Sequence, residues 1–432
     1  MTDRLVIHPA LIWTGDRFES DQQIVVEPDG TIGDVGPITE PVTEHGTWPD
    51  RAVMPGMVNT HSHAFQRGLR GSGEVFPGTA GSFWSWRETM YGLVEAMDEP
   101  TIYGLSHRAF TEMLRAGITT VGEFHYLHHD RTGSGYAFDE VVLRAAADAG
   151  IRIALLNVFY KTGGIGAAVQ GSQLRFWTAS LDEYWSQLDG LAGLLDPRTQ
   201  TLGVAAHSIR AVPLDLLAAL HEESRRRGLV FHMHVEEQQA EIADCVAAYD
   251  ARPMALLNSR LAIDERFCAV HCTHSASEDM EAFVAAGGTV CMCPLTEANL
   301  GDGIPDLPGM ADFRDRVSLG TDSNLRISFA DEMRLLEYAQ RLHTGSRGVF
   351  LDDAGRCGPA LWRAATVNGA RAIGVDAGEL RAGAAADFIT LDLTAPALAG
   401  WTPDTLLDSF VFGAGSEVIA EVYVGGRVSS DV

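Results

Sequence analysis

Lysine is nearly absent from this chain of 432 residues, and positive charge as a whole is scarce. Lys161 is the one lysine, and 32 lysine and arginine residues face 58 aspartate and glutamate residues, which leaves a formal net charge of -26 at pH 7. Nucleic-acid backbones and anionic membrane surfaces are bound by basic patches. The composition therefore argues against both of these partners and for a soluble acidic protein.

The sequence also lacks cysteine motifs and long apolar runs. Its 6 cysteines have no CxxC spacing of the kind that binds structural zinc, and most of them lie in or beside apolar runs, which predicts buried free thiols. No apolar run reaches the roughly 18 residues that a membrane-spanning helix needs. The start MTDRLVIHPALIW has no positive segment followed by a long apolar core, so we expect no signal peptide and a cytoplasmic protein.

Apolar, strand-like runs alternate with helical stretches through the middle of the chain. Eight such runs occur, from AVMPGMVNTHSH to RVSLGTDS, and several of the helical stretches between them close on glycine. Eight strand–helix alternations predict a (β/α)8 barrel of the TIM type, with a doubly wound open sheet as the alternative.

Short strands broken by turn signals mark both ends of the chain. QQIVVEPDGTIGDVG reads as a hairpin around its Pro-Asp-Gly-Thr turn, and GAAADFITLDL and VIAEVYVGGRVSS have the same short-strand character. We therefore expect a composite β-sandwich domain from residues 1–52 and 386–432, beside a catalytic barrel over residues 53–385.

Histidines and an aspartate gather at the predicted carboxyl ends of the barrel strands, where such barrels build their active sites. His61 and His63 in NTHSH stand two apart, so on a strand both side chains point to the same side. HMHVEE adds His232 and His234, VHCTH adds His271 and His274, and GTDS adds Asp322. Each could be an ordinary hydrogen-bonded strand-end residue, but together they include the three histidines and one carboxylate that suit a divalent metal such as zinc, with a position left for water. A structural zinc is usually held by cysteines instead.

The order of these motifs resembles the amidohydrolase superfamily, across residues 51–385. The resemblance implies one zinc ion per subunit, with metal ligands at His61, His63, His234 and Asp322. Members with two metals generally bridge them through a carboxylated lysine at the end of the fourth strand. Here that strand ends VAAHS, and the lone lysine ends the third strand candidate, so we expect a single metal.

A zinc ion with an open position lowers the pKa of bound water toward about 7 and supplies hydroxide at neutral pH. We expect Asp322 to accept the water proton, Glu237 to carry it to a leaving amine, and His271 to hold or polarise the water. HVEEQ places Glu237 three residues after His234, which resembles the deaminase branch of the superfamily. Glu236 competes with Glu237, and the choice of Glu237 requires that the strand ends or turns there.

Arginines beside the predicted site indicate a substrate with carboxylates. Arg210 follows His207 by three residues just past the fourth strand, and Arg87 lies in FWSWR after the first strand. Arginine binds carboxylates bidentately, so two converging arginines suit a dicarboxylate. The alternatives are an ordinary surface or helix-start residue for Arg87 and an ion-pair partner for Arg210. Arg326, after GTDSN, is a weaker candidate for the pocket.

Five segments together resemble the formimidoylglutamate deiminases, and the resemblance runs over nearly the whole chain. These segments are HSHAFQR, FWSWR, EFHYLHHD, HSIRAV and HVEEQ. The resemblance implies that Gln66 contacts the formimino end of N-formimino-L-glutamate. It also implies that four residues hold the two carboxylates of this substrate: Arg87, Tyr126, His207 and Arg210. Metal-bound hydroxide attacks the formimino carbon in this scheme and releases ammonia and N-formyl-L-glutamate, a step of histidine degradation. A homodimer is a further implication.

Two other classes of function stay open at this point. A deaminase of the same superfamily acting on a purine, pyrimidine or triazine ring needs a pocket for a flat neutral ring. A non-catalytic protein on a degenerate barrel predicts a damaged ligand set, whereas all the expected ligands and the glutamate are present.

Overall fold

The computed structural model describes residues 4–44, 46–74, 76, 83–307 and 314–429. Eight parallel strands form one sheet in the order β13-β12-β11-β10-β9-β8-β7-β6, so each strand pairs with its neighbour in sequence. The strands are β6 (Met57–Ser62), β7 (Ile118–His125), β8 (Arg152–Phe159), β9 (Gln200–Ser208), β10 (Phe231–Val235), β11 (Phe267–His271), β12 (Thr289–Met292) and β13 (Val317–Leu319). All eight predicted strands are present.

The first and last strands of this sheet meet just beyond β13. Asp322 forms an isolated parallel bridge with Ser62, its N–H donates to the carbonyl of His61 at 3.0 Å, and its carbonyl accepts from the N–H of His63 at 2.9 Å. The sheet is thereby nearly closed, and its order has no reversal of the kind that defines a doubly wound sheet. The predicted barrel is confirmed and the open-sheet alternative is excluded.

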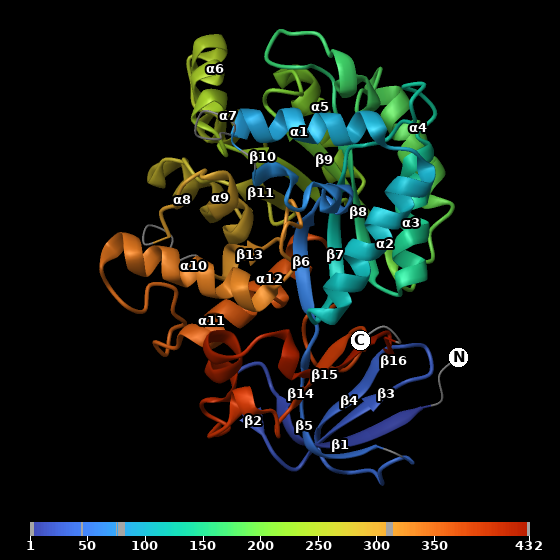
Figure 1. Cartoon of the computed structure of the whole chain (residues 1–432), viewed down its shortest axis with the longest axis vertical. Coiled ribbons are helices and arrows are strands. Elements are labelled where there is room, and N and C mark those ends of the chain that lie inside the picture. The colour runs from blue at the N-terminus through green and yellow to red at the C-terminus, as the bar shows by residue number, and fades with distance from the viewer. Residues whose placement is uncertain (1–3, 45, 75, 77–82, 308–313, 430–432) are drawn as a thin grey trace.

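Helices surround the barrel strands, as Figure 1 shows. β6 and β7 are buried at every position, because helices cover their outer face and side chains fill the barrel inside. The helices are α1 (Phe83–Ala96), α2 (Glu99–Arg115), α3 (Ala137–Ala149), α4 (Leu181–Ala192), α5 (Leu214–Arg226), α6 (Gln239–Tyr249), α7 (Pro253–Arg260), α8 (Ser277–Ala285), α9 (Pro294–Leu300), α10 (Phe329–Thr344), α11 (Cys357–Ala364), α12 (Val367–Ala372) and α13 (Leu406–Asp408).

Local sequence sets several of the helix boundaries. Asp98 caps α2 by accepting from the N–H of Thr101 at 3.0 Å, and Pro100 in the first turn needs no hydrogen bond of its own. Gly150 ends α3 in the left-handed conformation at φ 82°, which glycine adopts without strain. None of the helices in the described ranges is long and apolar enough to span a bilayer.

A second sheet lies below the barrel in Figure 1, on the side of the strands' amino ends. Its strand order is β16-β15-β14-β5-β1-β3-β4, with β2 paired to β1. Its strands come from both ends of the chain: β1 (Leu5–Trp13), β2 (Phe18–Glu19), β3 (Gln22–Val26), β4 (Ile32–Pro37), β5 (Thr47–Pro55), β14 (Phe388–Asp392), β15 (Ile419–Val424) and β16 (Arg427–Val428). The division of the chain into domains after residues 52 and 385 stays a prediction.

The second sheet is tied to the bottom of the barrel, away from the carboxyl ends of the strands. Arg152, which begins β8, donates from Nε to Asp387 Oδ2 at 2.6 Å, and that carboxylate also accepts from the N–H of Gly425 at 2.7 Å.

All six cysteines are free, and those in the barrel strands and just after them are buried, as expected.

Candidate active site

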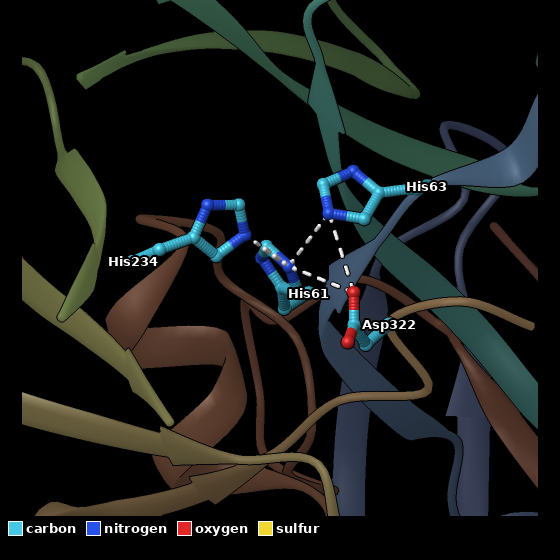
Figure 2. Close-up of side chains that lie close together, drawn as sticks. All are labelled: His61, His63, His234 and Asp322. Carbon is cyan, nitrogen blue, oxygen red and sulfur yellow. Dashed lines mark hydrogen bonds and ion pairs between the residues drawn. The ribbon is translucent and has the colours of Figure 1, made fainter. Parts of the chain in front are cut away.

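Three histidines and an aspartate converge at the carboxyl end of the barrel, as Figure 2 shows. His61 lies on β6 and His63 directly after it, His234 lies on β10, and Asp322 follows β13. His61 Nε2 is 3.2 Å from His63 Nε2 and 3.1 Å from His234 Nε2, and Asp322 Oδ1 is 3.4 Å from His61 Nε2 and 3.2 Å from His63 Nε2. These four predicted ligands therefore offer their donor atoms to one point, all within 4.8 Å of one another.

Backbone carbonyls fix which ring nitrogen of two histidines faces that point. His63 Nδ1 donates to the carbonyl of Phe124 at 2.9 Å, and His234 Nδ1 donates to the carbonyl of His207 at 2.9 Å. Because Nδ1 carries the proton in both rings, each neutral ring turns an Nε2 lone pair inward. Lone pairs and a carboxylate that converge in this way repel one another unless a cation lies between them, so the residues fit a divalent metal.

Burial and neighbouring charges keep this cluster in the protonation state that binds a metal. Burial lowers the pKa of His61 to about 3, so its ring is neutral at pH 7. Burial alone acts to raise the pKa of Asp322, but its hydrogen bond with His61 and its electrostatic interactions with His63 and His271 outweigh it and hold that pKa below its ordinary range. The cluster is therefore three neutral rings and one carboxylate.

Strand β10 ends at Val235, before Glu237, the residue that the sequence predicts as the proton carrier. Glu236 has a φ of +52°, the left-handed region that non-glycine residues rarely adopt, and this turn directs the next residue, Glu237, into the cavity beside the cluster. The carboxylate of Glu236 instead accepts from the N–H of Met254 at 3.2 Å. The condition that the sequence set for choosing Glu237 over Glu236 is met.

His271 ends β11 between three carboxylates. Its Nε2 lies 3.9 Å from Glu237 Oε1 and 3.9 Å from Asp322 Oδ2, and its Nδ1 lies 3.3 Å from Glu297 Oε1. Burial alone lowers the pKa of His271, but these carboxylates outweigh it and raise that pKa well above its ordinary value. Burial raises the pKa of Glu237 to about 7, although the charges of His271 and Arg210 act against it. Glu237 can therefore both accept and donate a proton near neutral pH.

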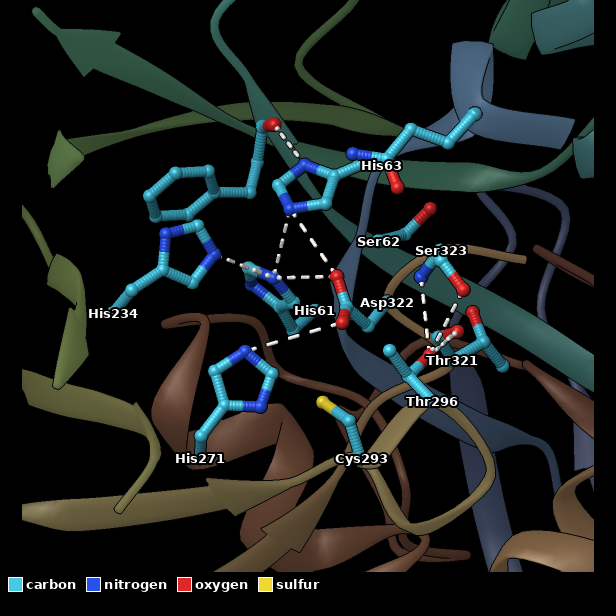
Figure 3. A network of polar contacts seen from close by, with 12 residues as sticks. His61, Ser62, His63, His234, His271, Cys293, Thr296, Thr321, Asp322 and Ser323 are labelled. Atoms are coloured by element: carbon cyan, nitrogen blue, oxygen red, sulfur yellow. Dashed lines mark hydrogen bonds and ion pairs between the residues drawn. The ribbon is translucent and has the colours of Figure 1, made fainter. Parts of the chain in front are cut away.

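The loop that carries Asp322 is held from the side of α9, as Figure 3 shows. Thr296 Oγ1 lies 3.0 Å from Ser323 Oγ and accepts from the N–H of Ser323 at 3.3 Å.

Asp322 has a φ of +45° and His271 a φ of +72°, so both site residues occupy a strained backbone conformation where their strands end.

A cavity of about 220 Å³ opens above the cluster. His61 is fully buried beneath it. The other predicted site residues all line the cavity: His63, Gln66, Arg87, Tyr126, His207, Arg210, His234, Glu237, His271 and Asp322. The structure thus brings together, in one cavity, residues that the sequence spreads over more than half of the chain.

Two arginines line this cavity in different settings. Arg87, on α1, donates from Nε to Tyr91 Oη at 2.7 Å, and its guanidinium lies 5.4 Å above the Trp84 ring. No carboxylate in the described part of the chain lies within ion-pair distance of Arg87. Arg210 Nε lies 3.0 Å from Glu241 Oε2, so Arg210 is an ion-pair partner as well as a cavity residue.

Two residues that the sequence raised lie elsewhere. Arg326 does not line the cavity: its side chain is 68% exposed and pairs with Asp331 at 2.6 Å, because the chain turns outward after Asp322 toward the start of α10. Lys161 Nζ donates to the carbonyl of Ala179 and lies 4.8 Å above the Trp177 ring, so it is not a member of the metal cluster.

Sequence reasoning missed several cavity residues. Tyr91 lies on α1, Tyr160 directly follows β8, and Phe176 follows a short 3-10 turn. Aromatic residues at such positions are more often part of a core, so nothing local distinguished them. The position of Tyr160 just past the end of a barrel strand was the one available signal.

Other histidines of the chain have structural partners. His125 Nε2 and His128 Nδ1 lie 3.1 and 2.8 Å from Asp139 Oδ1, and Asn157 Nδ2 donates to Asp139 Oδ2 at 2.9 Å. His128 Nε2 also lies 2.7 Å from the carbonyl of Val158. Both His128 nitrogens therefore face acceptors, which fits a buried imidazolium paired with a carboxylate.

We expect Asp139→Asn to lower the free energy of unfolding by about 3–5 kcal/mol, because it leaves the charge of His128 buried without its partner. Burial acts to lower the pKa of His128, but the neighbouring Asp139 outweighs burial, so the pKa of His128 is raised. Burial acts to raise the pKa of Asp139, but His125 and His128 outweigh burial, so the pKa of Asp139 is lowered. The pair therefore stabilises fully between the ordinary pKa values of 3.8 and 6.5, and its contribution falls as pH rises through the raised pKa of His128.

Urea unfolding of the metal-free protein at pH 5.5 and pH 9 measures this loss. Asp148→Asn, at an exposed position of the same helix, is the control and should change stability by less than about 1 kcal/mol. An Asp139→Asn loss no larger than the control, or one that grows with pH, contradicts the ion pair.

The nearly closed barrel, the His/Asp cluster and the adjacent acid define a metal-dependent hydrolase. The chain belongs to the amidohydrolase family, whose model matches residues 52–429. It is 38% identical to a formimidoylglutamate deiminase from Pseudomonas aeruginosa over 385 residues, which cover 87% of this chain and 84% of that protein.

Two further comparisons agree with this assignment. A crystal structure of an amidohydrolase from Brucella melitensis matches with a TM-score of 0.89 and 35% identity, covering 98% of this chain and 94% of that one. A 5-methylthioadenosine/S-adenosylhomocysteine deaminase from Natronomonas pharaonis is 29% identical, covering 87% of this chain and 80% of that protein. The relatives therefore include a formimidoylglutamate deiminase and a deaminase of 5-methylthioadenosine and S-adenosylhomocysteine.

Proposed function

We propose that this chain is a zinc-dependent iminohydrolase that converts N-formimino-L-glutamate and water into N-formyl-L-glutamate and ammonia, a step of histidine degradation. The observation that carries the proposal is the cavity itself, in which Arg87 and Arg210 line the same space as the metal cluster. A dianion in an acidic protein needs such a local positive site, and arginine pairs bind carboxylates with defined geometry. The likeness to the Pseudomonas aeruginosa deiminase supports the same substrate.

The amide of Gln66 is oriented to receive the formimino group. Its Nε2 donates to Tyr126 Oη at 2.8 Å, which leaves Oε1 as an acceptor, and Oε1 is buried without a hydrogen-bond partner in the described ranges. An unpaired buried acceptor costs free energy unless a ligand satisfies it. A formimino N–H group is a donor of the required kind.

His61, His63, His234 and Asp322 would hold the zinc ion. When bound there, zinc lowers the pKa of a coordinated water toward about 7 and polarises the group that it faces. Asp322 Oδ1 faces the histidines, whereas Oδ2 faces His271 at 3.9 Å and is placed to accept a proton from water.

Glu237 completes the proton transfer to the departing nitrogen. Its pKa of about 7 lets the carboxyl give a proton to the terminal formimino nitrogen and regain one from water. His271, whose Nε2 lies 3.9 Å from both Glu237 and Asp322, stands between the two carboxylates, where its positive charge offsets their repulsion and its ring would hold or polarise the attacking water. The oxygen of water adds to the formimino carbon, and the terminal nitrogen, which receives both protons of that water through Asp322 and Glu237, leaves as ammonia as the formyl C=O bond forms.

The proposed substrate is tested by removing one of its charges. N-formimino-L-glutamine has nearly the same shape as N-formimino-L-glutamate but carries a neutral amide in place of the side-chain carboxylate. We expect its kcat/KM to be about 10- to 100-fold lower, because a hydrogen bond to a charged group contributes about 1.5–3 kcal/mol. The difference in kcat/KM between the two substrates should be smaller in Arg210→Gln, because this variant has already lost one of the positive charges that attract the carboxylates. Equal kcat/KM for both substrates contradicts the arginine-bound dicarboxylate.

A further inference from the structure

A buried glutamine connects three residues at the arginine-lined end of the cavity. Gln173 lies in the 3-10 turn Gly171–Arg175 and is 7% exposed. Its Nε2 lies 3.2 Å from each of three acceptors, namely Tyr91 Oη, Tyr160 Oη and the carbonyl of Gly163. All three of these residues line the cavity, while Gln173 stands behind them.

The direction of these hydrogen bonds is fixed by the other end of the amide. Gln173 Oε1 accepts from the N–H of Gln170 at 3.0 Å, so the group that faces the tyrosines is the NH₂ donor. The two hydrogens of this NH₂ group are shared among the two tyrosine hydroxyls and the Gly163 carbonyl, and each hydroxyl acts as an acceptor in its contact with Gln173. Tyr91 Oη also accepts from Arg87 Nε at 2.7 Å.

Each tyrosine hydroxyl still has its own hydrogen to donate. In the described part of the chain, no hydrogen bond from either Tyr91 Oη or Tyr160 Oη to a protein acceptor is present, and both residues face the cavity. Their free hydrogens are therefore left for a bound ligand.

Tyr160 lines the same cavity as both arginines. Its ring stands 4.9 Å from that of His207 and it is 4% exposed. Burial raises the pKa of Tyr160 to about 12, and the positive charges of Arg87 and Arg210 act against that rise. The hydroxyl is therefore neutral and lies within the field of both guanidinium groups.

We infer that Tyr91 and Tyr160 donate hydrogen bonds to the substrate carboxylate that Arg87 and Arg210 attract, and that Gln173 is a positioning residue that turns both hydroxyls toward it. The inference rests on the proposed dicarboxylate substrate. It adds two neutral donors to the site and explains why a glutamine is buried behind the cavity wall.

Dissociation constants of glutarate and N-formyl-L-glutamate, measured by calorimetry on the zinc-loaded full chain, test this inference alongside KM and kcat. We expect Tyr160→Phe and Gln173→Leu each to raise both dissociation constants and the KM by about tenfold or more, with kcat within about threefold and zinc content unchanged. Tyr103→Phe, which removes an exposed hydroxyl that donates to Asp148 at 2.7 Å, is the matched control and should change nothing.

A combined variant distinguishes a role of Gln173 in positioning the two hydroxyls from a general contribution of Gln173 to the structure of the cavity. If Gln173 acts through the two hydroxyls, adding Gln173→Leu to the Tyr91→Phe/Tyr160→Phe double variant should weaken binding by less than about threefold more. Fully additive losses, or a fall of kcat at constant KM, overturn the positioning role. Unchanged dissociation constants in Tyr160→Phe overturn the donor role, and this variant carries the test if Gln173→Leu does not fold.

Failure of the inference is distinguishable from failure of the proposed function. A wild-type chain that binds glutarate but releases no ammonia from N-formimino-L-glutamate contradicts the proposed reaction and leaves the hydroxyl donors supported if the variants lose glutarate. A wild-type chain that binds neither dicarboxylate overturns both.

Discussion

Glu237→Gln is expected to keep its metal and lose turnover by about 10²- to 10⁴-fold, the range that a positioned acid–base group contributes. Glutamine retains the shape of the side chain but cannot accept or donate the proton that the leaving nitrogen needs. The residue does not belong to the four-ligand cluster, so metal binding should persist. Steady-state ammonia release and metal content of the same preparation measure the two effects.

The neighbouring glutamate supplies a matched control for this prediction. Glu236→Gln changes the same chemical group one residue away, where the side chain bonds to the N–H of Met254 outside the cavity. Its turnover should stay within about tenfold of the wild-type value if the protein folds. Turnover of Glu237→Gln near that of the wild type would show that another group moves the proton.

His61→Ala is expected to lose its bound metal, with turnover lost in parallel. His61 Nε2 contacts the donor atoms of His63, His234 and Asp322, so its removal takes away the central ligand of the cluster. Removing a partner that merely orients a ligand already costs about 10- to 100-fold in affinity, and removing a ligand should cost more. Metal content after dialysis against a weak chelator measures the loss.

His232→Asn is the control for the metal prediction. This histidine lies on β10 two residues before His234, but its Nε2 donates to the carbonyl of Ala372 at 2.9 Å, away from the cluster. The variant should retain one equivalent of metal. One full equivalent in His61→Ala would contradict the assignment of the ligands.

The barrel and the metal cluster could be predicted from the sequence because both depend on local periodicity. Two histidines separated by one residue point the same way on any strand, and the carboxyl ends of parallel barrel strands meet at one face. Correct strand boundaries therefore place His61, His63 and His234 at one end of the barrel, but the choice of these histidines as ligands came from the resemblance to the amidohydrolases. The choice between Glu236 and Glu237 needed more, because it depends on a φ of +52° at Glu236, which no propensity of glutamate predicts.

The cavity wall was less accessible to sequence reasoning. The Arg87–Tyr91–Gln173–Tyr160 chain joins α1, a 3-10 turn and the end of β8, and its contacts depend on how these elements pack. Arg326 shows a different error, in which a residue outside the cavity is taken for a cavity residue. It follows Asp322 closely in sequence, yet its side chain points into solvent and pairs with Asp331. A short distance in sequence from a site residue does not determine where a side chain points, because the turn after the site residue sets that direction.

We propose that the metal cluster beside the arginine-lined cavity deaminates a linear dicarboxylate. Ammonia release by the zinc-loaded chain, given N-formimino-L-glutamate and, separately, guanine, adenosine and cytosine, tests it most directly. We expect fast release from N-formimino-L-glutamate and release from the three ring compounds that is at least about 10³-fold slower, since these lack carboxylates for the arginines to bind. Release from a ring compound with none from N-formimino-L-glutamate would contradict it.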